Sequence, residues 1–159
     1  MVTAWYWTSC AKASEDVRLL NRPLFLVLHQ ERPIVRAIQH HNGFVVFERG
    51  CIWGRSHVVA AYLKNAYIAT LDFSQFSTLV RLRALEVGFS VFDDQDLISI
   101  GSNDTLEFLF AARTLITDAS IDVLMHFKQL KILNLSGCSV SSHGLDSLRR
   151  RLTRCNITA

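Results

Sequence analysis

The sequence between residues 130 and 140 reads Leu130-Lys-Ile-Leu133-Asn-Leu135-Ser-Gly-Cys138-Ser-Val140. Its pattern is L-x-x-L-x-L-x-x-C-x-V, in which the L-x-L part is typical of a short strand with both leucines on one face. Cys138 is small enough for a turn after that strand, and a side-chain donor there can satisfy backbone carbonyls that the turn would bury. The stretch therefore predicts a strand followed by a tight turn.

The same pattern recurs twice upstream without an insertion, at the constant spacing that separates Leu82 from Leu106 and Leu106 from Leu130. We call this spacing the period. The matching positions of the three copies are, in order, Leu82, Leu85, Val87, Ser90 and Phe92, then Leu106, Leu109, Ala111, Thr114 and Ile116, then Leu130, Leu133, Leu135, Cys138 and Val140. Self-similarity at a fixed period of this length is the signature of a repeat architecture. From about Leu82 onward, the chain is therefore predicted to consist of stacked repeats.

Each copy continues with residues that favour the start and buried face of a helix. Helix-capping types occur at Asp93 and Asp96, at Thr117 and Ser120, and at Ser141. Apolar pairs three residues apart follow them at Leu97 and Ile100, Ile121 and Leu124, and Leu145 and Leu148, which would turn one helix face toward the strands. One repeat cannot bury its apolar face alone, so neighbouring repeats must stack.

The two ends of the array fit the pattern less well. Leu152, Cys155 and Ile157 repeat the strand spacing of Leu130, Leu133 and Leu135, slightly less than one period later, and they predict an edge strand of a truncated fourth repeat. Upstream, we favour a strand at Tyr67–Ser74 in a compact first repeat. The alternative keeps the strict phase and places Ala61 and Leu63 on the strand.

Residues 1–69 are predicted to form an irregular α/β cap, and residues 70–159 the repeat array. Within the cap, Pro33–His41 has the apolar spacing of a helix, Asn42-Gly43 would end it, and Phe44–Phe47 favours a strand. We also expect a helix at Asp16–Leu20, and either a strand or a buried helical turn at Leu24–Leu28.

Two segments resemble the cysteine-containing class of leucine-rich repeats. Thr117-Asp-Ala-Ser-Ile-Asp-Val-Leu124 resembles its T-D-x-G-L-x-x-L helix opening, with Ser120 in place of the usual glycine, and Leu133-Asn-Leu-Ser-Gly-Cys138 resembles its strand and turn. The class occurs in F-box substrate receptors of ubiquitin ligases and in bacterial repeat proteins, although no F-box sequence is found in residues 1–50. The resemblance implies a right-handed horseshoe of parallel strands and outer helices, and a binding scaffold without an active site.

The residues between the inward leucines would form the concave strand face of such a horseshoe. Phe108, Phe110 and Ile132 are large and apolar, and an exposed apolar patch usually marks an interface. With Glu86 and Asn134 they form the predicted partner-binding site. The partner is expected to be another protein, whereas coverage by the N-terminal flank or by a second copy of the chain is the alternative. A role as a receptor or accessory subunit of an enzyme complex such as a ubiquitin ligase is also considered.

Composition argues against several other classes of protein. The net charge is only +3, so no strong basic field suggests nucleic acid. The four cysteines form no C-x-x-C pair, and no histidine cluster has metal-ligand spacing, so neither a cofactor nor a metal is expected. No phosphate loop or nucleophile motif is present, which predicts that the chain is not an enzyme. No apolar run reaches the length of a membrane span, and we expect a cytoplasmic protein.

Overall fold

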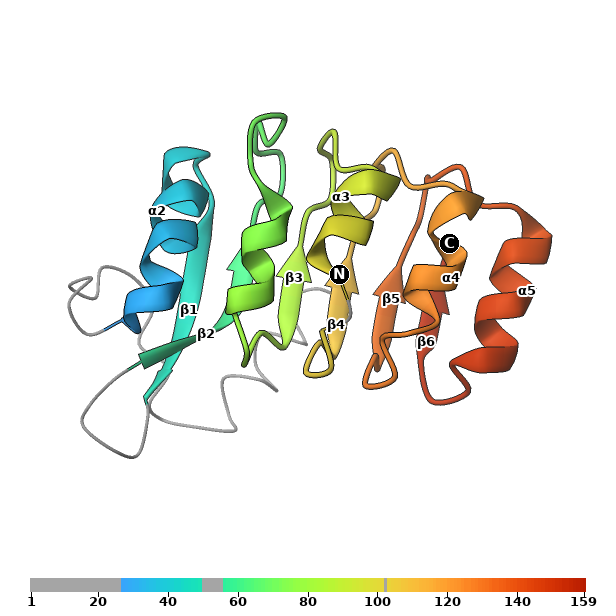
Figure 1. Cartoon of the computed structure of the whole chain (residues 1–159). Coiled ribbons are helices and arrows are strands. Elements are labelled where there is room, and N and C mark those ends of the chain that lie inside the picture. The colour runs from blue at the N-terminus through green and yellow to red at the C-terminus, as the bar shows by residue number, and fades with distance from the viewer. Residues whose placement is uncertain (1–26, 50–55, 102) are drawn as a thin grey trace.

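In the part of the chain that the structure describes, six strands form one mixed sheet and lie side by side in chain order (Figure 1). The computed structural model describes residues 27–49, 56–101 and 103–159. The strands are β1 (Phe44–Arg49), β2 (Ser56–Tyr62), β3 (Ala84–Glu86), β4 (Phe108–Phe110), β5 (Ile132–Asn134) and β6 (Asn156–Thr158). β1 runs antiparallel to β2, and each later strand runs parallel to the one before it.

The strand register confirms the period. Ala61 pairs with Leu85, Leu85 with Leu109, and Leu109 with Leu133, so each pair is separated by one period. The last pair, Leu133 with Ile157, keeps the same spacing. An edge strand at the end of this chain is therefore confirmed. Its predicted shorter spacing is wrong, because Ile157 lies opposite Leu133 and not opposite Leu135.

The predicted strand at Tyr67–Ser74 is wrong, and the alternative in strict phase is correct. β2 supplies the strand with Ala61 inside, and Leu63 follows it, donating its backbone N–H to the Glu86 carbonyl at 2.7 Å. Residues 67–72 form a loop, which leads into a 3-10 helix. Leu71 and Phe73 are buried as expected, because the loop and helix also direct them into the core.

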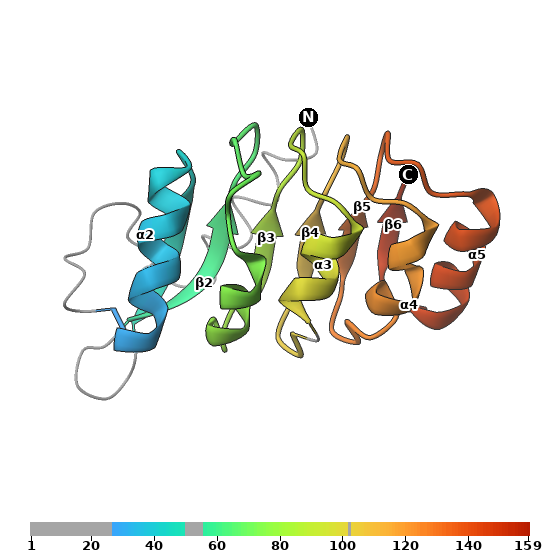
Figure 2. The same ribbon diagram turned by 45° about the horizontal axis from the view of Figure 1, so that its top comes forward.

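The described helical segments cover one face of the sheet (Figures 1 and 2). They are α2 (Arg32–His40), η3 (Phe73–Thr78), α3 (Asp94–Ile100), η4 (Asp118–Ser120), α4 (Ile121–Leu124) and α5 (Ser142–Arg151), and a short turn, η2 (His29–Glu31), precedes α2. The predicted capping residues lie at their starts. Asp93 and Asp96 form a reciprocal capping box, and the Ser141 hydroxyl accepts the Gly144 N–H at 3.1 Å.

A continuous core lies between the sheet and these helices. The central residues of β3, β4 and β5, namely Leu85, Leu109 and Leu133, are fully buried, whereas Ile157 of β6 is partly buried. The apolar residues of the following helices, such as Leu97 and Leu124, belong to the same cluster. Because the inward residues of neighbouring repeats belong to one cluster, each repeat depends on its neighbours for burial.

The cap is a helix and an antiparallel strand pair joined to the first parallel strand. α2 ends at His40, and Asn42, with φ of 59°, turns the chain into β1 as the Asn-Gly signal predicts. Gly43 is enclosed there, since a Cβ would lie 2.8 Å from the Tyr62 carbonyl oxygen and 2.6 Å from Leu63 Cδ2. The predicted helix at Asp16–Leu20 lies outside the described residues, as do residues 24–26 of the Leu24–Leu28 segment.

The turns after β2, β3, β4 and β5 each have one residue in the left-handed region of backbone conformation. These residues are Asn65, Phe89, Arg113 and Gly137, with φ of 57°, 59°, 54° and 76°, and each lies one period after the one before it. Glycine and asparagine adopt this conformation readily, whereas phenylalanine and arginine do not. The repeated backbone geometry therefore constrains the turn more strictly than the sequence suggests.

Polar side chains tie neighbouring repeats together on the helical side. The Asp94 carboxylate accepts hydrogen bonds from the Thr117 backbone N–H at 2.8 Å, from the Thr117 hydroxyl and from the Ser120 hydroxyl. One period later, Asp118 accepts the Ser141 N–H at 2.8 Å. In the part of the chain that the structure describes, no helix has the length and apolarity that a membrane crossing requires.

Candidate partner-binding face

The five predicted site residues lie on one face of the sheet and in adjacent strands. Successive residues of a strand point to opposite faces, so the neighbours of the buried Leu85, Leu109 and Leu133 face away from the helices. They form two rows across the sheet, in which hydrogen-bonded strands bring equivalent residues side by side. We call these rows the strand face; they are Ala60, Ala84, Phe108, Ile132 and Asn156, and Tyr62, Glu86, Phe110, Asn134 and Thr158.

The apolar part of the strand face is partly buried rather than open. Phe108, Phe110 and Ile132 are each intermediate in exposure. Phe108 pairs in register with Ile132, and Phe110 pairs with Asn134, so the three side chains form a group near the middle of the face. The structure thus brings the predicted apolar residues together.

The polar residues of the face have defined neighbours. Glu86 lies between Tyr62 and Phe110 in its row, and partial burial raises the pKa of its carboxyl, an effect that Lys64 at 3.9 Å partly offsets. Asn134 accepts the Ser136 N–H at 3.0 Å, which fixes the side chain at the start of the turn. Tyr62 was not predicted as part of this face, because the strict phase that places it there was the less favoured interpretation.

The most exposed apolar side chains lie elsewhere and were not predicted. Among the described residues, large hydrophobic side chains are well exposed at Tyr67, Val80, Phe89, Val91, Ile98 and Leu115. Phe89 belongs to the turn after β3, and Val91 follows it by two residues. The periodic pattern gives no signal for these residues, because it identifies the buried positions and leaves the turns unspecified.

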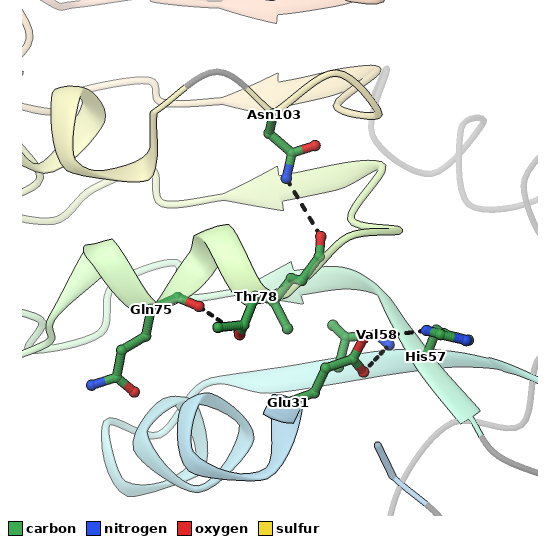
Figure 3. Close-up of polar contacts among 7 residues, drawn as sticks. Glu31, His57, Val58, Gln75, Thr78 and Asn103 are labelled. Atoms are coloured by element: carbon green, nitrogen blue, oxygen red, sulfur yellow. Dashed lines mark hydrogen bonds and ion pairs between the residues drawn. The ribbon is translucent and has the colours of Figure 1, made fainter. Parts of the chain in front are cut away.

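A buried carboxylate joins the cap to the sheet (Figure 3). Glu31 is fully buried, accepts the Val58 backbone N–H at 3.0 Å and lies 3.3 Å from His57 Nδ1. Burial raises the pKa of Glu31, although the Val58 hydrogen bond and His57 act in the opposite direction. The contact connects η2 to β2 and is distant in sequence from the predicted face, so we interpret it as a structural joint.

A polar hollow of 310 Å³ opens at the edge of the sheet where β3, β4 and β5 begin. Its acidic and basic groups are partly paired, since Glu107 contacts Arg83 at 2.8 Å and Lys131 at 2.6 Å. Its lining residues are Glu48, Arg81, Arg83, Asp104, Thr105, Glu107 and Gln129. Burial opposes ionisation of Glu107, but the hydrogen bonds and charges of Arg83 and Lys131 lower its pKa, so it is a stable ion-pair partner.

The two described cysteines have structural surroundings. The Cys138 thiol donates to the Ala111 carbonyl at 3.0 Å, as the turn position predicted. Burial raises the pKa of Cys155 to about 11, which disfavours the reactive thiolate form. Within residues 27–49, 56–101 and 103–159, no group of three or more His, Cys, Asp or Glu is arranged to hold a metal ion.

Comparisons with known proteins give little further information. No family model and no curated protein matches the chain. One matching solved structure is a leucine-rich-repeat protein of Leptospira interrogans, with 18% sequence identity and a TM-score of 0.44. The match covers 54% of this chain and 21% of that protein, and a likeness this partial supports no conclusion about fold or function.

Proposed function

We propose that this chain is a leucine-rich-repeat module that binds another protein on its strand face and catalyses no reaction. The observation that carries the proposal is the grouping of Phe108, Phe110 and Ile132 on the side of the sheet opposite the helices. Aromatic and aliphatic side chains at the centre of a patch contribute most of the binding energy of a typical protein interface. Glu86 and Asn134 would supply polar contacts beside them.

The geometry supports binding because parallel strands hold the group rigidly. Residues on adjacent strands are fixed in register by backbone hydrogen bonds, so the face is organised before a partner arrives and little ordering cost remains. The constant period and the capped helix starts fit the leucine-rich-repeat class that the sequence resembles, and we extend that assignment to a horseshoe-shaped array. The second class of function that the sequence suggested, a subunit of an enzyme complex, would use the same face.

The test is affinity capture followed by mass spectrometry with the wild type and a Phe108→Ser/Phe110→Ser variant. A Val80→Ser/Ile98→Ser variant is the matched control, because it removes two exposed apolar side chains away from the strand face, which are 52% and 43% exposed. All three proteins must give the same circular dichroism spectrum. We expect a protein that the wild type and the control retain and that the strand-face variant loses.

Self-association is a separate outcome of the same design. Light scattering of the three purified proteins measures whether the strand face holds two copies together. If the wild type is a dimer and the Phe108→Ser/Phe110→Ser variant is a monomer, the strand face binds a second copy of this chain. Retention of the same set of proteins by the wild type and both variants contradicts the proposal.

A further inference from the structure

Phe89 occupies a position that its backbone conformation does not favour. It lies in the turn after β3 with φ of 59°, and its side chain is 46% exposed. Its N–H donates to the Ala112 carbonyl at 2.8 Å, which holds the turn against the next repeat. Two of the three equivalent turns use Asn65 and Gly137, which adopt this conformation at less cost, and the third uses Arg113. The fold therefore gives no reason for an aromatic residue here, and conformations of this kind are concentrated at binding sites.

Two cations from neighbouring turns contact the ring of Phe89. Lys64 Nζ lies 5.2 Å from the ring centroid and the Arg113 guanidinium carbon lies 5.4 Å from it. Both distances are within the range of cation–π attraction. Three successive repeats thus contribute one residue each to a single cluster at the edge where the chain leaves the strands.

Two more exposed apolar residues belong to the same pair of loops. Val91 is 47% exposed and Leu115 is 58% exposed. The loops that carry them are joined by the hydrogen bond from the Leu115 N–H to the Phe92 carbonyl, at 2.8 Å. We call Lys64, Phe89, Val91, Arg113 and Leu115 the turn patch.

The charge of the turn patch is positive. Lys64 is half exposed and has a long contact of 3.9 Å with Glu86, and no ion pair of the described residues includes Arg113. The carboxylates that follow in the chain are used within the fold, because Asp93 caps α3 and Asp94 binds Thr117 and Ser120. Arg113 is therefore available to a carboxylate of a partner, and Lys64 is held to Glu86 only by that long contact.

We propose that the turn patch is a second protein-docking surface, which takes an acidic segment that carries an apolar side chain. The apolar side chain packs against Phe89, Val91 and Leu115, and flanking carboxylates pair with Lys64 and Arg113. Aromatic residues and arginine are enriched among the residues that dominate binding energy. Apart from the contact of Lys64 with Glu86 of the strand face, this proposal stands on observations made outside that face.

The test is selection of a displayed random-peptide library against the full chain. Enriched peptides are expected to share an apolar residue flanked by Asp or Glu. A labelled peptide of that consensus is then titrated against the wild type, Phe89→Gly and, as a control, Ile98→Ala. Phe89→Gly removes the ring and relieves the turn, so the variant remains folded, and we expect its affinity to fall about tenfold or more. Ile98 is an exposed apolar residue on α3, and the Ile98→Ala variant should bind the peptide as the wild type does.

The charged part of the proposal has its own readout. The affinity of the wild type for the peptide is expected to weaken as salt increases, and an Arg113→Gln/Lys64→Gln variant should bind more weakly with a smaller dependence on salt. The Phe108→Ser/Phe110→Ser variant should bind the peptide unchanged. If the Phe108→Ser/Phe110→Ser variant loses peptide binding and Phe89→Gly keeps it, the turn patch is not the binding site. The peptide then binds at the strand face. A library that yields no enriched peptide, or peptides without acidic residues, also overturns the proposal.

Discussion

The cap and the repeat array both have to bury the apolar face of the sheet, and they do so in different ways. In the array, a buried strand residue has an equivalent residue on each side, as Leu109 has in Leu85 and Leu133. In the cap, an antiparallel strand pair, a helix and the buried Glu31 carboxylate close the sheet without any repetition. Repetition makes each site of the array depend on its neighbours, whereas the cap depends on individual contacts.

The largest expected effect follows from that shared burial. Leu109→Ala removes a fully buried side chain from the middle of the array and leaves a cavity between two repeats. We expect the free energy of unfolding to fall by about 2–5 kcal/mol in urea denaturation. Ile98→Ala, whose side chain is 43% exposed, is the control and should change stability far less. Equal losses for the two variants would contradict the central position of Leu109 in the core.

A smaller loss of stability is expected when Asp94, which links two neighbouring repeats, is changed. Burial would raise the pKa of Asp94, but hydrogen bonds from Ser120 and Thr117 outweigh it and lower the pKa below its ordinary value of 3.8. The carboxylate therefore stabilises the fold above pH 3.8, and this contribution is lost as the pH falls through the lowered pKa. Asp94→Asn should cost about 1–2 kcal/mol at neutral pH and progressively less in acid.

The measurement is urea denaturation of the wild type and Asp94→Asn at several pH values. Asp122→Asn, an exposed substitution on α4, is the control and should leave the free energy of unfolding unchanged. A difference between the wild type and Asp94→Asn that stays constant down to low pH would show that the charge of Asp94 does not tie the repeats together.

The contribution of Glu31 in the cap to stability should change with pH in the direction opposite to that of Asp94. This effect should be the smallest of the three. Because burial raises the pKa of Glu31 above 4.5, the folded state favours the protonated carboxyl. Its contribution to stability is present below pH 4.5 and is lost as the pH rises through the raised pKa. Glu31→Gln is neutral at every pH, and its amide oxygen can still accept the Val58 N–H.

We expect Glu31→Gln to match the wild type in acid and to equal or exceed it, within about 1 kcal/mol, near neutrality. Thermal unfolding at matched pH values tests this expectation. If the variant instead loses stability as the pH rises, the ionised carboxylate is the form that holds the cap to the sheet, and the proposed opposition between the two regions is wrong.

The sequence predicted most of the array, because burial in it repeats. Leucines that recur at one constant period identified β3, β4 and β5, and hydroxyl and carboxylate residues identified the helix starts. The grouping of the five predicted site residues on one face followed from the alternation of side chains along a strand. Binding at that face stays a prediction.

The periodic pattern did not predict two features of the structure. Within Tyr67–Ser74, residues 69–74 alternate apolar and polar as a strand does. Leu71 and Phe73 nevertheless reach the core through a loop and a 3-10 helix, so the predicted burial is right and the predicted element is wrong. The turn patch was missed because Phe89 and Arg113 carry no signal for a left-handed turn. Their equivalents Asn65 and Gly137 do carry one, and alignment of the turns in the strict phase would have revealed it.

Amide hydrogen exchange of residues 59–89 tests most directly whether the repeat phase extends into the cap. Leu63 and Asn65 donate to the carbonyls of Glu86 and Gly88, as Val87 and Phe89 donate to those of Phe110 and Ala112 one period later. We expect all four amides to be protected to a similar degree, since they occupy equivalent places in one sheet. Rapid exchange at Leu63 and Asn65, together with protection across residues 67–74, would contradict the account.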